Sequence, residues 1–222
     1  MIKSNCARNG CKDVFRAFLV KNASFSGVFE IPGIPASHKI PNKLIPFSKC
    51  ISSKEHDAWV HFYEDDVCFE RIWNSPNKYI GILKRFNGVI TPDFSLYRDM
   101  PLAMQIWNTY RSRALGNWFI YNGIDVIPNI RWGDKRTFDF CCNGIVKNGT
   151  IAVGTHGCIK SSLERCFFEE GLKYIVEKIL PETIVVYGSA PEKIFGVYQK
   201  NGINVIQFDS MFMEAHQKVV SI

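Results

Sequence analysis

The sequence predicts an α/β fold, with a mostly parallel sheet of about five or six strands and helices on both faces. Short apolar runs rich in Val and Ile alternate with longer segments of helical periodicity. The runs are continuously apolar, as expected for strands that are covered on both faces. Strands that alternate with helices pair in parallel through right-handed crossovers. A partial β/α barrel is the alternative that the same order of elements allows.

The regular alternation begins after residue 57, and each expected element is bounded by polar or turn-forming residues. We expect strands at residues 58–63, 88–91, 125–130, 150–154, 183–187 and 204–208. We expect helices at residues 67–73, 99–121, 161–179 and 191–199, with a further turn near 79–84 and a short helix near 137–142.

The two longest helices carry recognisable start signals. Asp99 is suited to cap the first of them, with Pro101 in the first turn, and Arg111 and Arg113 are expected to point away from the core. Ser161 and Glu164 have the spacing of a capping box at the start of the second. The expected apolar face of the first is Leu102, Ala103, Ile106, Trp107, Tyr110, Ala114, Leu115 and Trp118. The second is expected to bury Leu163, Phe167, Ile175 and Ile179.

The chain divides by charge into a basic leading segment, residues 1–50, and a single α/β domain, residues 51–222. The leading segment holds eight basic and two acidic residues, which accounts for the net charge of +6 of the whole chain. Four prolines break every candidate helix between residues 30 and 50, so this stretch is expected to wrap around the body in extended form. These prolines are Pro32, Pro35, Pro41 and Pro46.

No apolar run is long enough to span a membrane, and the amino terminus lacks a secretion signal, so we expect a cytoplasmic protein without membrane partners. The eight cysteines are then most simply reduced thiols. Cys6, Cys11 and Cys50, with His38 or His56, are a weaker alternative as a zinc site, because their spacing is loose.

Polar residues follow the carboxyl end of each expected strand, where α/β proteins build their sites. Asp93 is the candidate catalytic carboxylate, as general base or nucleophile, or alternatively a cap for the following loop. His156 is the candidate acid, base or phosphate donor, or alternatively a histidine bonded to the loop backbone. Ser95 and Tyr97 follow Asp93 and are expected to contact the same ligand.

Two further loops and one dipeptide favour an anionic ligand. Thr155 and Gly157 precede the helix at 161–179, while Gly188 and Ser189 precede the helix at 191–199; small residues there let backbone N–H groups approach phosphate, or simply turn the chain. Arg131 and Trp132 offer a guanidinium beside a stacking surface, a pairing suited to nucleotides.

His61, Glu64, Asp65, Asp66 and Glu70 could ligate a hard metal ion. Acidic residues are also favoured in the first turn of a helix, and we prefer this structural interpretation, with no metal site. The sequence identifies no cofactor, oligomeric state or definite enzymatic reaction.

Several blocks of residues resemble the family known as domain of unknown function 4417, which occurs in bacteria and phages. The resemblance spans about residues 40–190, with Thr91 where the family has Ser, and rests on the blocks at 61–73, 88–97, 100–111 and 123–128 and on Trp132. It implies a phage, prophage or mobile-element setting and supplies no activity or catalytic residue.

Three functions fit these observations. The first is binding, and potentially hydrolysis, of a phosphate-bearing, nucleotide-like ligand at the carboxyl edge of the sheet. The second is a nucleic-acid-associated role in mobile-element replication, with residues 1–50 on the phosphate backbone. The third is non-catalytic binding of a host protein. We favour the first.

Overall fold

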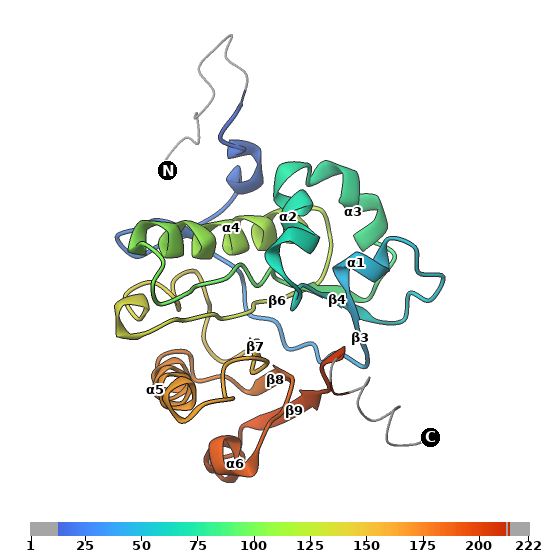
Figure 1. Ribbon diagram of the computed structural model, residues 1–222. Helices are drawn as coiled ribbons and strands as arrows, with labels where there is room; N and C mark the ends of the chain where they lie inside the picture. Colours follow the sequence, from blue (N-terminus) through green and yellow to red (C-terminus); the bar gives the residue numbers. More distant parts are fainter. Residues whose placement is uncertain (1–12, 212, 214–222) are drawn as a thin grey trace.

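The computed structural model describes residues 13–211 and 213, in which seven strands form two parallel sheets (Figure 1). Strand order follows chain order within each sheet, so the expected single sheet of five or six strands is not observed. The four-stranded sheet contains β3 (Leu44–Pro46), β4 (Trp59–His61), β5 (Gly88–Ile90) and β6 (Val126–Ile127); the three-stranded sheet contains β7 (Thr150–Gly154), β8 (Thr183–Tyr187) and β9 (Asn204–Phe208). A small antiparallel pair, β1 (Phe25–Ser26) and β2 (Ile31–Pro32), precedes them.

Each sheet carries helices on one face only, in contrast to the expected cover on both faces. Figure 1 shows α1–α4 on one side of the strands and α5 and α6 on the opposite side. The helices are α1 (Phe47–Cys50), α2 (Asp66–Asn74), α3 (Asn77–Leu83), α4 (Leu102–Tyr121), α5 (Ser162–Ile179) and α6 (Glu192–Lys200), with 3₁₀ helices η1 (Ala17–Val20) and η2 (Lys135–Thr137).

The second face of each sheet packs against the other sheet, which explains why most strand residues are apolar. The two sheets are linked where the chain beyond β6 pairs with β7: the Ile130 amide donates to the Ala152 carbonyl at 2.9 Å. Each of the seven strands of the two sheets contributes a residue to the core between them. This core contains Trp59, Ile90, Ile127, Ala152 and Val185, with Leu44, Tyr63 and Phe208 packed against it.

Most element positions agree with the sequence-based expectations. The strands at 150–154, 183–187 and 204–208 are confirmed to the residue. β6 is shorter than expected because the chain beyond Pro128 leaves β5 to pair with β7. The expected helix near 137–142 is instead η2, which begins after Asp134, whose side chain accepts from the Arg136 amide. β3 was not predicted; it tolerates Pro46 because it is an edge strand.

The amino-terminal half of α4 reverses the predicted orientation. Its apolar residues Leu102 and Trp107 are 36% and 45% exposed. The reason is that this half packs on the polar loop after β5: the Asn108 side chain donates to the Ser95 carbonyl at 2.7 Å. The buried polar residues of α4 are Gln105, Asn108, Thr109, Arg111, Ser112 and Arg113. Of the predicted face, Ala114 and Leu115 are buried, Ile106, Tyr110 and Trp118 are half-buried, and Ala103 is exposed.

The start signals of the two long helices also differ from expectation in part. α4 begins at Leu102, and Asp99 lies before it without capping it. For α5, the Ser161 hydroxyl accepts from the Glu164 amide at 3.1 Å, as the capping motif predicts. Ile175 and Ile179 are buried as predicted. Phe168 takes the core position expected for Phe167, and Leu163 is exposed.

Arg113 is buried, although we expected it to point away from the core. Its guanidinium donates to the backbone carbonyls of Asn129 (2.8 Å), Cys141 (3.0 Å) and Asn143 (3.4 Å). Burial lowers the pKa of Arg113 to about 10. Carbonyl dipoles, rather than a carboxylate, offset the cost of burying this charge.

The leading segment contributes to the core where it is described. Phe47 and Cys50 are fully buried against the helices above the four-stranded sheet. Burial raises the pKa of the Cys50 thiol to about 12, which disfavours the thiolate that a zinc ion needs. Cys6 and Cys11 lie outside the described residues, His38 pairs with Glu182 at 2.9 Å and His56 packs on Phe86. The domain boundary at residue 50 stays a prediction, and none of the helices described here is long and apolar enough to cross a membrane.

His61 ends β4 in the interior between the two sheets. It is 2% exposed, and its Nδ1 accepts from the Tyr63 amide at 3.1 Å. Its ring lies 4.5 Å from that of Tyr187. Burial lowers the pKa of His61 from 6.5 to about 3, so the folded protein holds this imidazole neutral.

Replacing Arg113 by Met should destabilise the protein strongly, because three backbone carbonyls, two of them buried, lose their donor. We expect a loss of about 3 kcal/mol or more in the free energy of unfolding. Urea denaturation followed by circular dichroism measures it. Arg165→Met, at an exposed position of α5, is the matched control and should change stability little. A loss for Arg113→Met no greater than for the control would contradict the role given to this side chain.

His61 should make the protein less stable in acid. Between pH 6.5 and about 3 the unfolded chain binds a proton on this residue that the folded chain does not, so stability falls as pH falls. From about pH 8 to about pH 5 the loss from His61 is ~2 kcal/mol. His61→Asn, which keeps an acceptor near Nδ1, should flatten this dependence in urea titrations. An unchanged pH slope in His61→Asn would refute the assignment.

Candidate functional site

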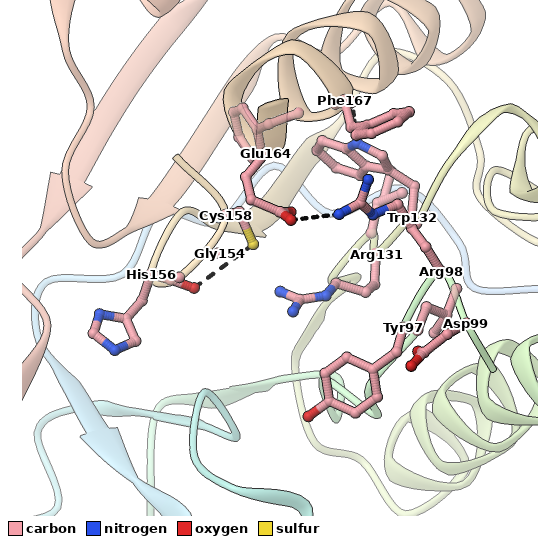
Figure 2. A pocket seen from close by; sticks show the side chains of 15 residues that line it. Tyr97, Arg98, Asp99, Arg131, Trp132, Gly154, His156, Cys158, Glu164 and Phe167 are labelled. Carbon is pink, nitrogen blue, oxygen red and sulfur yellow. Dashed lines mark hydrogen bonds and ion pairs between the residues drawn. The ribbon is translucent and has the colours of Figure 1, made fainter. Parts of the chain in front are cut away.

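A cleft lies at the carboxyl ends of β5, β6 and β7, against the first turns of α5. Its volume is about 770 Å³. Figure 2 shows side chains converging on it from the loops after these strands and from α5. The sequence-predicted residues that line it are Tyr97, Arg131, Trp132, His156 and Gly157. Those that do not line it are Asp93, Ser95, Thr155, Gly188 and Ser189.

Arg131 is fixed from behind by a chain of polar side chains. The Asp93 carboxylate contacts Arg131 Nη1 at 3.3 Å and accepts from Asn129 Nδ2 at 2.7 Å. The Tyr63 hydroxyl donates to Asn129 Oδ1 at 2.9 Å, and the Tyr63 ring stacks on that of Tyr187 at 4.7 Å. The chain therefore holds one guanidinium in a single place beside the cleft.

Burial and charge act on this pair in opposite directions. Burial raises the pKa of Asp93, against the lowering effects of Arg131 and the Asn129 hydrogen bond. The Asp93 charge in turn raises the pKa of Arg131, which stays protonated. The Asp93 side chain is 11% exposed and both of its oxygens accept contacts. It lies behind Arg131, apart from the cleft surface.

The two aromatic residues predicted for the site differ in accessibility. Tyr97 is 59% exposed, and Figure 2 shows its ring and the Arg131 guanidinium beside the same cavity. Trp132 is buried, and its indole N–H donates to the Phe167 carbonyl at 3.2 Å. It packs so closely on Gly171 that a Cβ atom there would lie 2.0 Å from the indole nitrogen. Tyr97 is the accessible ring, and Trp132 forms part of the wall.

Another part of the cleft wall is formed by an ion pair that the sequence did not reveal. Arg98, from the loop after β5, pairs with Glu164 in the first turn of α5 (Figure 2). The Arg98 guanidinium lies 4.3 Å from the centre of the Phe167 ring. From the sequence we interpreted Glu164 only as a capping residue. Its partner Arg98 comes from a distant loop and could not be identified from local sequence.

The two glycine-bearing loops pack on each other instead of both facing the cleft. Thr155 is buried, and its hydroxyl donates to the Ser189 carbonyl at 2.8 Å. Gly188 has a φ of 107°, and a Cβ atom there would lie 2.6 Å from Thr155 Oγ1. His156 is exposed at the rim, with its pKa lowered by partial burial and by Lys160.

The acidic residues after β4 have separate partners. Asp66 accepts from the Ser95 hydroxyl at 3.0 Å, and that hydroxyl lies 3.2 Å from the Tyr97 hydroxyl oxygen. Glu64 binds Ser48, and Glu70 pairs with Arg111 at 2.7 Å. Within residues 13–211 and 213, no group of three His, Cys, Asp or Glu side chains is arranged to hold a metal ion.

Comparison with known proteins identifies relatives of this chain. A family model described as Domain of unknown function (DUF4417) matches residues 23–209. The Gene 1 protein of Mycobacterium phage L5 is 35% identical over 167 residues, which cover 73% of this chain and 72% of the phage protein. The Gene 1 protein of Mycobacterium phage D29 is 34% identical over 167 residues, again 73% of this chain but 62% of its own length, less than two thirds. No solved structure matches.

The cysteines at the cleft should differ in reactivity. Burial raises the pKa of the Cys158 thiol, which lines the cleft, whereas Cys166 is exposed on α5. Because the thiolate is the reactive form, iodoacetamide at about pH 8 should modify Cys166 well before Cys158. Peptide mass spectrometry over time measures both, with urea-unfolded protein as the control in which the rates converge. Faster modification of Cys158 would show that the cleft is more open than described.

Proposed function

We propose that this chain, which belongs to the family Domain of unknown function (DUF4417) and has relatives in two mycobacteriophages, binds a nucleotide-like anion in the cleft. The observation that supports this is the placement of Arg131. Its guanidinium is held from behind by Asp93 while it lines the cleft next to the accessible ring of Tyr97.

A guanidinium fixed in this way suits a phosphate group. Arginine presents five N–H donors in a planar fork, and the contact with Asp93 involves only Nη1. The fork matches the spacing of phosphate oxygens, and prior orientation by Asp93 reduces the entropy lost on binding. The cleft volume of about 770 Å³ falls within the range of small-ligand sites.

The ring of the ligand would lie against Tyr97. This side chain is 59% exposed, and an aromatic face in such a position offers stacking to a planar base. Trp132 and Phe167 supply the apolar wall of the cleft. His156 at the rim is suited to donate a hydrogen bond to the bound ligand.

Asp93 serves in this proposal as a positioning residue, not as the base or nucleophile considered from the sequence. Its contacts to Arg131 and Asn129 occupy the carboxylate, and Arg131 separates it from the cleft. The proposal is therefore one of binding and includes no hydrolytic step.

The nucleic-acid alternative receives less support from the described residues. Lys43 in the leading segment pairs with Glu55 at 2.8 Å, and Lys39 lies 3.7 Å from Asp125. Lys3, Arg8 and Lys12 lie outside the described residues. The host-protein alternative stays a prediction.

Nucleoside phosphates should stabilise the wild-type protein against heat, and Arg131→Gln should abolish this effect. A ligand at about 100 times its dissociation constant adds ~2.7 kcal/mol to the free energy of unfolding, which a melting scan detects easily. The probes are nucleoside mono-, di- and triphosphates of adenine, guanine, cytosine and uracil, tested at millimolar concentrations.

Two further variants make this test specific. Arg165→Gln removes an exposed charge from α5 outside the cleft lining and should bind as the wild type does. Asp93→Asn should weaken binding less than Arg131→Gln, because the guanidinium stays but loses its orientation. No melting shift with any nucleoside phosphate, in protein shown to be folded, would refute the proposed function.

A further inference from the structure

We infer that the ligand carries a single phosphate and that Glu164 is the specificity-determining residue that excludes longer phosphate chains. The inference rests on the proposed function and concerns the same cleft. It follows from the balance of charge in the cleft lining and from the position of the Arg98–Glu164 ion pair.

The residues lining the cleft carry no net charge. Arg98 and Arg131 are matched by Asp99 and Glu164, and Asp93 adds a negative charge behind Arg131. Lys160 supplies a cation only near His156 at the exposed rim. A site for a triphosphate would need several cations facing the ligand, because such a ligand carries about four negative charges without a bound metal ion.

Arg131 alone is sufficient for one phosphate group. A phosphate monoester carries about two negative charges at neutral pH, and a bidentate arginine contact satisfies two of its oxygens. The lining thus matches a nucleoside monophosphate better than any longer chain.

Glu164 blocks the place where a second phosphate would bind. It engages Arg98, whose guanidinium is also stacked on Phe167. It presents its negative charge in the cleft lining itself, whereas Asp93, the partner of Arg131, does not line the cleft. Glu164 also places a negative charge in the first turn of α5, where the helix dipole would otherwise favour a phosphate. Ser161 accepts one of the amide hydrogens at that end of the helix.

Calorimetric titration without divalent metal ions separates the possibilities. Wild-type protein should bind adenosine monophosphate about tenfold or more tightly than adenosine triphosphate, the ratio expected for about 1.4 kcal/mol of charge repulsion. Glu164→Gln removes this repulsion and frees Arg98, so it should remove or reverse the preference. Parallel titrations with the guanine, cytosine and uracil series cover the choice of base.

Glu169→Gln is the matched control, because it removes the same charge from α5 at an exposed position near Tyr198 of α6. It should leave the ratio of the two affinities unchanged. Arg98→Gln keeps Glu164 and removes its cation, and should weaken triphosphate binding further; it provides a second test if Glu164→Gln does not fold.

Each result has a distinct meaning. A wild-type preference for triphosphate, or a ratio unaffected by Glu164→Gln and Arg98→Gln, would overturn the single-phosphate inference while leaving the proposed function intact. Absence of binding by every nucleoside phosphate would refute the proposed function itself.

Discussion

Arg113 is the constraint on which the arrangement of this protein depends. A guanidinium buried without a carboxylate is costly unless other dipoles surround it, and here backbone carbonyls from Asn129, Cys141 and Asn143 do so. Asn129 lies where the chain leaves the four-stranded sheet to pair with β7, and α4 carries Arg113 itself. The same side chain therefore links the longest helix to the junction of the two sheets.

Asn129 extends this constraint to the cleft. Its carbonyl accepts from Arg113, its amide donates to Thr91, and its side chain joins Tyr63 to Asp93. Asp93 then orients Arg131. An interior polar network thus runs from the buried arginine of α4 to the arginine of the cleft. Fully satisfied networks of this kind specify one arrangement, because each member left without its partner would be costly.

The sequence predicted the strands well and the helix faces less well, for one physical reason. β7 and β8 are buried along their whole length and are apolar after an initial Thr, so their limits are clear. Hydrophobic periodicity assumes that polar residues face water. In α4 the buried side instead meets a polar loop, so Asn108 and Arg113 turn inward and Trp107 turns outward. The link between the sheets depends on pairing between distant segments, which local patterns do not record.

The candidate site shows the same limit at the level of single residues. We expected Arg131 and Tyr97 to lie together because each follows the carboxyl end of a parallel strand, and such ends meet at a common edge. Both residues line the same cleft. Tyr63 and Glu164 act through partners far away in the chain, and nothing local in the sequence identifies those partners. A carboxylate at a strand end is suited equally to catalysis or to orienting a neighbour. For Asp93 the contacts favour the orienting role that we propose, because its oxygens accept from Asn129 and Arg131, and Arg131 but not Asp93 lines the cleft.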